Sequence, residues 1–400
     1  YTLANAHAVS EEGVVRVKVK ERPDPSRDPE VAGLINAQTQ AAYRFSAGQV
    51  SNVMRRLETI HGGRERRNNV GLSLVPMEQL GAMPGDNPIM QQQKEYMLAT
   101  GMVEHVGGSE GEARPGSSGV SEGGKVSWWL DGAMDLGFKR RDKVREGFRF
   151  STDGLTAGAD ISVSPNIIIG AGLGYGRDES RVGVNGTESR ADAVSGFVYG
   201  SWQPKPSIFV DGVLGYTDMA FSASRWSSEA NSHMASQRDG SQVFGAIAAG
   251  WEHRGRRLHW SPYGRIEFAD IELDGFTERG ADMWKLRFEE QKSTRVTAAA
   301  GVQGDYLFRF RSGDLSPTFR AEYRHEVKNG GQTGVRYAEW EDSPRYGIEL
   351  APYDDRNLVA AVGVKWEAVG GARFSVNYET TLINRSAQDG RLRMEFSVKY

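Results

Sequence analysis

The chain has 400 residues, a formal net charge of −3 and 25% charged residues, and it contains no cysteine. This composition excludes disulfides and thiolate metal sites, and the near-neutral charge gives no case for nucleic-acid binding. No apolar run approaches the roughly 18 residues that a membrane-spanning helix requires, which excludes an α-helical membrane protein but not a barrel, where only alternate residues need be apolar.

Residues 1–20 contain a short alternation of valines with basic residues, from Val15 to Lys20, after a turn near Gly13. This pattern predicts a hairpin that is too small to be stable alone. We therefore expect residues 1–20 to be the end of an immunoglobulin-like module. Because no signal peptide opens the chain, we expect it to be the C-terminal part of a longer exported protein. The proline-rich residues 21–29 are expected to form a linker.

A long helix is predicted over residues 30–61. Asp28 is suited to the N-cap, Pro29 to the first helical position and Glu30 to the first turn, and two glycines follow His61. At a rise of 1.5 Å per residue this helix would be about 48 Å long, which exceeds the hydrocarbon thickness of a membrane.

The apolar residues of this helix are sparse, and it carries many amides, including Asn36 and Asn52, and a basic pair, Arg55 and Arg56. Two interpretations stay open: a coiled coil or stalk, or a helix inside a polar cavity that satisfies its amides. In a cavity, we expect Arg55 and Arg56 to be neutralised by carboxylates of the wall. The following residues 62–125 are expected to be a flexible connector that is mostly disordered.

From Val126 to the end, apolar and polar residues alternate with the period of a β-strand. A soluble sandwich could produce one such strand, but the stripe recurs about every 20 residues and the chain ends on an aromatic residue, which is typical of a membrane-spanning β-barrel. The final strand shows the pattern best, with one apolar face made by Leu392, Met394, Phe396, Val398 and Tyr400.

We predict an all-β fold over residues 126–400, a twelve-stranded antiparallel transmembrane β-barrel with the N-terminal α-helix through its pore. Short turns and longer charged loops alternate along it, including loops at 181–190 and 222–238, as in an outer-membrane barrel. A barrel of twelve strands has an interior about wide enough for one helix. The predicted strands are 126–140, 148–164, 167–182, 188–203, 207–226, 236–254, 258–275, 288–310, 315–338, 345–368, 371–384 and 389–400.

Charged residues opposite the apolar stripes are expected to face the lumen, because an arginine facing lipid at mid-depth would cost about 2–4 kcal/mol. The residues assigned to the lumen in this way are Arg320, Glu322, Arg324, Glu326, Lys365, Glu367, Arg373 and Glu379.

No catalytic, cofactor or metal site is predicted. The seven histidines are scattered without the spacing of metal ligands. Carboxylates such as Glu322 and Glu326 share a strand face, which could suggest acid–base chemistry, but in a polar lumen we expect them to pair with arginines. Alternating glycines over 170–176 echo a phosphate-binding loop, yet no helix follows them. No GDSL-type nucleophile block occurs.

The long polar helix, the twelve strands and the terminal aromatic together resemble the C-terminal translocator β-domain of autotransporters (type Va secretion), particularly members with Ig-like passengers. The resemblance covers roughly 30–61 and 126–400. It implies a bacterial outer-membrane location, a pore-threading helix and export of the N-terminal passenger to the cell surface. It also implies assembly by the barrel-assembly machinery, which would read the last strand, with help from periplasmic chaperones. The Asn-Asn motif of self-cleaving members is not present in 30–61.

The favoured hypothesis is thus an outer-membrane translocator that anchors its own passenger, a monomer surrounded by lipid. A rival hypothesis is a diffusion pore in which 30–61 is a plug. A third is autoproteolysis in the lumen, using Asn36 or Asn52 with barrel carboxylates.

Overall fold

The computed structural model describes residues 22–62, 69–74, 126–141, 145–339, 342–350, 356–369, 372–382 and 387–398. The predicted Ig-like fragment, most of the predicted connector and Tyr400 lie outside these residues. The elements are η1 Pro25–Arg27, α1 Pro29–Gly62, β1 Asn69–Leu74, β2 Val126–Lys139, β3 Phe148–Ser164, β4 Ile167–Val182, β5 Thr187–Lys205, β6 Ile208–Ser227, β7 Ser232–Trp251, β8 His253–Arg254, β9 Leu258–Leu273, β10 Phe276–Thr277, η2 Asp282–Trp284, β11 Leu286–Phe288, β12 Gln291–Tyr306, β13 Phe308–Phe310, β14 Gly313–Tyr337, β15 Tyr346–Leu350, β16 Arg356–Ala368, β17 Ala372–Thr381 and β18 Ala387–Val398.

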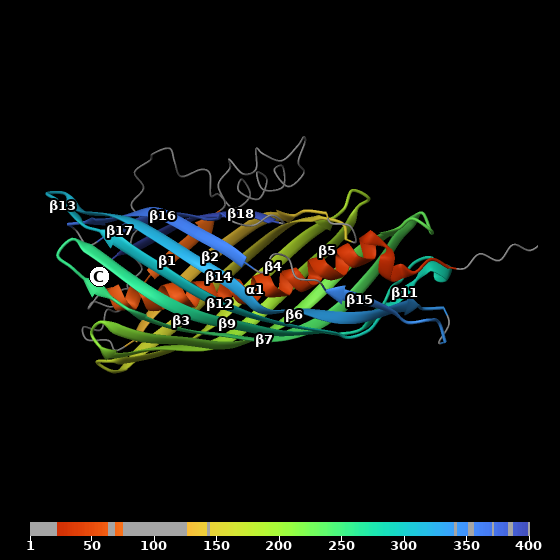
Figure 1. The fold of residues 1–400 in the computed structure, drawn as a ribbon, viewed down its shortest axis with the longest axis horizontal. Helices are drawn as coiled ribbons and strands as arrows, with labels where there is room; N and C mark the ends of the chain where they lie inside the picture. Colours follow the sequence, from red (N-terminus) through yellow and green to blue (C-terminus); the bar gives the residue numbers. More distant parts are fainter. Residues whose placement is uncertain are drawn as a thin grey trace, which may run out of the picture.

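The long strands form one mostly antiparallel sheet in which sequence neighbours pair (Figure 1). Pairing runs from β2 through β7 and then through β9, β12, β14, β16 and β17 to β18. The last strand, β18, also pairs with β2 over Ala387–Asp389. Helix α1 runs along the inside of the curved sheet (Figure 1). Among the described residues, no helix is long and apolar enough to cross a membrane.

Strands β3 and β4 coincide with the predicted ranges, whereas the predicted strand 345–368 contains two strands, β15 and β16. Two predicted loops, 181–190 and 222–238, were wrong. They are tight links over 183–186 and 228–231, with positive φ at Gly183, Gly186 and Asn231. The strands continue as polar ribbons, because pairs such as Arg181 opposite Glu188 keep the backbone ladder intact.

The two faces of the sheet differ as the period of a strand demands. Along β6, Leu214 and Tyr216 are about half exposed, whereas their neighbours Val213 and Thr217 are buried. The inner face is not simply charged, however. Aromatic side chains from β5, β6 and β7 line it and pack on the helix. A helix that buries apolar residues inside a barrel needs such partners, and a purely polar cavity would not supply them.

Inward-facing glycines on β4 let the helix approach the wall closely. A Cβ on Gly176 would lie 2.7 Å from the ring of Phe45, and one on Gly174 would lie 2.4 Å from the side chain of Gln49. Both helix residues would have to move if these positions carried side chains. The glycine run therefore has a packing role.

The prediction of a flexible connector over 62–125 needs a correction. Residues Asn69–Leu74 form strand β1, which pairs with β18 on one side and with β2 on the other. Six residues are too few for periodicity alone to identify a strand. The strand is defined by partners on β2 and β18 that are distant in sequence.

Candidate functional site

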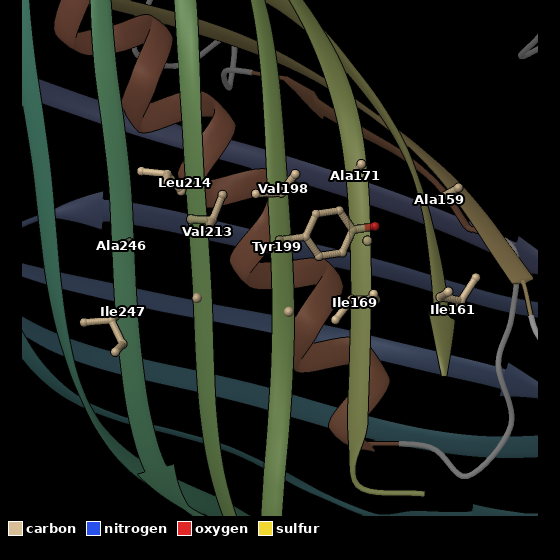
Figure 2. A pocket seen from close by; sticks show the side chains of 13 residues that line it. Ala159, Ile161, Ile169, Ala171, Val198, Tyr199, Val213, Leu214, Ala246 and Ile247 are labelled. Carbon is tan, nitrogen blue, oxygen red and sulfur yellow. The ribbon is translucent and has the colours of Figure 1, made fainter. Parts of the chain in front are cut away.

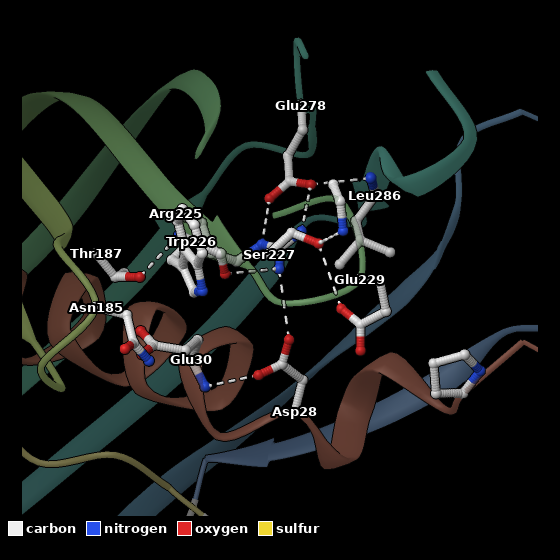
Figure 3. Close-up of polar contacts among 12 residues, drawn as sticks. Asp28, Glu30, Asn185, Thr187, Arg225, Trp226, Ser227, Glu229, Glu278 and Leu286 are labelled. Carbon is white, nitrogen blue, oxygen red and sulfur yellow. Dashed lines mark hydrogen bonds and ion pairs between the residues drawn. The ribbon is translucent and has the colours of Figure 1, made fainter. Parts of the chain in front are cut away.

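The N-terminal end of α1 is held by polar contacts to the strand ends around it (Figure 3). The Asp28 carboxylate accepts a hydrogen bond from the Glu30 backbone N–H at 2.9 Å, as an N-cap does. Arg225 of β6 lies 3.5 Å from Asp28 and donates to Glu278 at 2.6 and 2.9 Å. Asn185 donates to the Glu30 side chain at 2.9 Å. These contacts fix where the chain enters the helix.

Apolar side chains cover the face of α1 that meets β5, β6, β7 and β9. Val53 and Leu57 are fully buried, and they belong to one cluster with Phe197, Val213 and Phe244. Burying a side chain of this size stabilises the packed state by about 1.5–3 kcal/mol. This apolar wall therefore supplies much of the free energy that keeps the helix inside the sheet.

Three arginines of α1 meet three aspartates on consecutive strands. Arg55 lies 3.2 Å from Asp131 of β2, and Arg44 lies 2.5 Å from Asp178 of β4. The third pair, between Arg56 and Asp160 of β3, is bidentate, with distances of 2.8 and 3.1 Å.

Both side chains of this third pair are almost completely buried. Such a pair requires its partner, because removing one charge leaves the other unpaired at low dielectric. We call Asp131, Asp160 and Asp178 the acidic wall.

The predicted pore-helix residues thus all have partners in the structure. Arg55 and Arg56 pair as described above, and Asn52 donates to Thr156 of β3 at 2.8 Å. Asn36 donates to the Ala32 carbonyl at 2.8 Å and accepts from Arg145 at 3.2 Å. The side-chain nitrogens of both asparagines donate hydrogen bonds.

At the C-terminal end of α1, His61 lies among polar groups. Its Nε2 is 2.8 Å from Ser201 Oγ and 3.0 Å from Asp211, and its Nδ1 is 3.5 Å from Glu252. These residue types occur in hydrolytic triads, but here a carboxylate competes with the serine for Nε2 and Ser201 is buried. The cluster anchors the helix end to β5, β6 and the β7–β8 link.

The strands farther along the sheet reach α1 through long side chains. Arg320 donates to Glu58 of the helix at 2.6 Å. Glu322 is fully buried, contacts Tyr263 and Arg324, and accepts from Arg265 at 2.9 Å. Arg320, Glu322 and Arg324 of the predicted lumen set therefore lie in one network.

The other residues of that set lie in smaller contacts. Glu326 is 3.8 Å from Arg295, which in turn lies over the ring of Tyr43. Lys365 is 3.8 Å from Asp305. The remaining three are Glu367, Arg373 and Glu379. Glu367 and Arg373 lie 2.8 Å apart. Glu379 is half-buried and is opposite Ala361 on β16 and Arg391 on β18.

In the predicted assembly strand, Leu392, Met394 and Phe396 are opposite Tyr378, Val376 and Phe374 of β17, and Val398 is opposite Ala372. Tyr400 is outside the described residues. Sequence reasoning missed Arg44, Glu58, His61 and the aspartates Asp160 and Asp178 as contact residues. The sequence did contain a signal for the two aspartates. Asp160 and Asp178 each occupy an inward-facing position of their strand, within a run of small inward-facing residues.

A shallow apolar hollow of about 840 Å³ lies on β3–β7, with α1 behind the strands (Figure 2). It is lined by exposed residues such as Ile169, Val198 and Leu214, and it forms where Gly200 and Gly212 are opposite each other without side chains. Its lining has no charged residue. The ion pairs and hydrogen bonds described above lie instead on the inner face, around the helix.

Among the described residues, no group of three or more histidines and carboxylates is arranged to hold a metal ion. The inner face combines a buried helix, an apolar wall and paired charges, which suits a protein that holds a polypeptide segment.

Comparison with known proteins agrees with this geometry. Residues 128–379 match the family model of the autotransporter β-domain. The fold is similar to the translocator domain of the autotransporter NalP from Neisseria meningitidis, with 14% identity, a TM-score of 0.54 and coverage of 78% of this chain and 96% of that one.

Two curated relatives, the esterases EstA of Pseudomonas aeruginosa and Pseudomonas putida, are each 25% identical over 211 residues. The matched segment is 49% of this chain and 30% of either esterase. The family match covers more than half of the chain. The chain therefore belongs to the autotransporter β-domain family and is a translocator of a passenger protein in the bacterial outer membrane.

Proposed function

We propose that the sheet closes into a twelve-stranded barrel and that α1 threads its pore as the tether between the barrel and an N-terminal passenger. The burial of α1 along almost its whole length carries this proposal. With 34 residues, the helix is about 51 Å long at 1.5 Å per residue, enough to cross the hydrocarbon layer.

Polar contacts of α1 at every level support the same proposal. At the N-terminal end of α1, Asp28 and Glu30 contact residues at the strand ends. Along the helix, Arg44, Arg55 and Arg56 pair with the acidic wall. At the C-terminal end, His61 contacts polar residues. A stalk or coiled coil would leave these wall carboxylates without the helix arginines. The pairing of β18 with β2 supports closure, since an open sheet edge in lipid leaves backbone groups unsatisfied.

The eight residues assigned to the lumen, from Arg320 to Glu379, would face this pore. The translocator function is transport, and we propose that the domain itself is not an enzyme. We further propose that the passenger is Ig-like and that the chain is a monomer embedded in lipid. Its assembly would depend on periplasmic chaperones and on machinery that reads the last strand, Leu392 to Tyr400.

Deletion of residues 29–61 tests the pore-threading proposal. The variant without residues 29–61 should still reach the outer membrane, but it should unfold at a lower temperature than the intact chain. It should also conduct ions in planar bilayers, whereas the intact chain should not conduct. The matched control replaces Asn36 and Asn52 by glutamine, which should leave the pore shut. Equal conductance of the intact and deleted chains would show that the helix does not occlude a pore, and would favour the diffusion-pore hypothesis instead.

The mass of the intact chain after overnight incubation tests the autoproteolysis hypothesis. A chain that cleaves itself would yield a fragment with a break within 30–61, and that fragment would disappear in the glutamine control. We expect the full mass in both samples.

A further inference from the structure

The seam between the first and last long strands is paired in two different ways. Near one end, β2 and β18 pair directly, with Lys139 opposite Ala387 and Gly137 opposite Asp389. Toward the other end, β1 lies between them, antiparallel to β18 and parallel to β2 (Figure 1). The seam therefore has an additional strand along only part of its length.

The insertion of β1 does not change the register of the seam. If the direct pairing continued from Gly137 and Asp389 along both strands, Leu130 would be opposite Phe396. These two residues are the two partners of Val70 in β1. In the same way, both partners of Leu72, Gly132 and Met394, would be opposite each other.

This continuity has a physical consequence. A register slip of one residue would exchange the two faces of a strand, which is costly when one face is apolar. Since no slip is needed, β2 and β18 could pair directly wherever β1 leaves. The backbone edges of the seam would be satisfied with β1 present and with β1 absent, so the two arrangements can interconvert without leaving an open edge in lipid.

The sequence of β1 suits a strand that adds to two edges. Its apolar residues Val70, Leu72 and Leu74 alternate with Gly71 and Ser73. In the register these three are opposite the apolar residues Phe396, Met394 and Leu392. Strand addition uses main-chain hydrogen bonds for affinity and alternate side chains for specificity, and β1 combines a paired backbone with an alternating sequence.

We propose that the β2–β18 seam is a strand-binding site and that β1 is its resident, removable ligand. The ligand class is an extended peptide with apolar residues at alternate positions. Binding of β1 widens that part of the wall by one strand, and its departure lets β2 and β18 pair directly and narrows the channel. This inference goes beyond the translocator function and does not require α1 to occlude a pore.

Disulfide trapping can test the proposal cleanly, because the chain has no cysteine. The pairs Gly71→Cys with Glu395→Cys and Leu72→Cys with Met394→Cys join opposite residues of β1 and β18. At least one of these pairs should cross-link in folded protein, because the two represent the alternating pair types of an antiparallel ladder. The out-of-register control, Gly71→Cys with Arg391→Cys, should not.

A third pair, Gly132→Cys with Met394→Cys, reports direct contact between β2 and β18. With β1 in place these residues are two strand spacings apart, about 10 Å, which is too far for a disulfide. Replacing 69–74 by glycine and serine at the same length should raise the yield of this cross-link about ten-fold, because it becomes limited by ordinary strand spacing. The conservative triple variant Val70→Ile, Leu72→Val, Leu74→Ile should keep the yield low.

If the glycine–serine variant does not fold, Leu72→Pro provides the same test, because it weakens β1 while leaving β2 and β18 intact. Failure of both β1–β18 pairs to cross-link in the intact chain would show that β1 does not occupy the seam. A folded glycine–serine or proline variant without the β2–β18 cross-link would show that β1 is not removable. Either result would overturn the proposal.

Discussion

The two walls that hold α1 differ in chemistry. On the apolar wall, formed by β5, β6, β7 and β9, Val53 and Leu57 pack among aromatic and aliphatic side chains. On the acidic wall, formed by β2, β3 and β4, each of three arginines meets one aspartate. Apolar burial is non-directional, so it favours enclosure without choosing one position for the helix.

Ion pairs behave differently. A buried pair contributes little net stability compared with an apolar pair of the same size, but losing one partner is expensive. The acidic wall therefore determines how far α1 is inserted and how it is rotated, while the apolar wall supplies the free energy that keeps it there.

The sharpest way to break this division is to unpair one buried charge. Arg56→Met should destabilise the folded chain by about 3–5 kcal/mol, because Asp160 is then left charged and buried. Urea unfolding in detergent micelles measures the loss. The double variant Arg56→Met, Asp160→Asn should recover most of it, and a double variant as unstable as the single one would contradict the assigned role of the acidic wall.

Truncation on the apolar wall should have a smaller effect. Leu57→Ala removes a fully buried side chain and should cost about 3 kcal/mol in the same assay. Ile60, one turn away on the helix and only partly buried, is the matched control. The Ile60→Ala variant should lose less than half as much stability, and equal losses would mean that the degree of burial against the apolar wall does not set the loss.

The start of the helix offers a subtler test, since Asp28 both caps α1 and faces Arg225. Asp28→Ala should cost about 1 kcal/mol through loss of the cap. Burial raises the pKa of Asp28 above its usual range, so the charged form is disfavoured in the folded state and the contribution of Asp28 falls as pH rises through that pKa.

Asp28→Asn keeps a capping oxygen and removes the buried charge. Its unfolding midpoint at neutral pH should therefore stay closer to that of the unaltered chain than the midpoint of Asp28→Ala. If asparagine were as costly as alanine, the charge on Asp28, rather than the cap, would be the stabilising feature.

The smallest effect is expected at Glu289, outside both walls. Hydrogen bonds donated by Arg336 and Arg345 lower the pKa of Glu289. A carboxyl group whose pKa is lowered by folding stabilises the folded state at pH values above its pKa in the unfolded chain. That stability is lost as the pH falls through the pKa of the folded state. Because the group is partly exposed, the contribution should be below about 1 kcal/mol. The difference between the unfolding midpoints at pH 7 and pH 3 should be slightly smaller for Glu289→Gln than for the unaltered chain. An identical difference in the two proteins would contradict this role.

The local pattern of the chain was sufficient for most of the sheet. The prediction for Phe148–Ser164 and Ile167–Val182 was right to the residue, because alternation of side chains is a property of each strand by itself. The helix start was equally local, since Asp28, Pro29 and Glu30 carry their capping roles in sequence order. The predicted loops at 181–190 and 222–238 were wrong because charged residues can continue a ladder beyond the apolar stripe.

By itself, the sequence determined where most of the long strands lie, where the helix begins and which strand faces are apolar, since these depend on interactions between near neighbours. Only the tertiary structure decided that Arg56 meets Asp160 rather than another carboxylate, and that β1 enters the seam. Both depend on register between segments far apart in the chain. Every inward aspartate is chemically equivalent in the sequence, and distance in three dimensions distinguishes them.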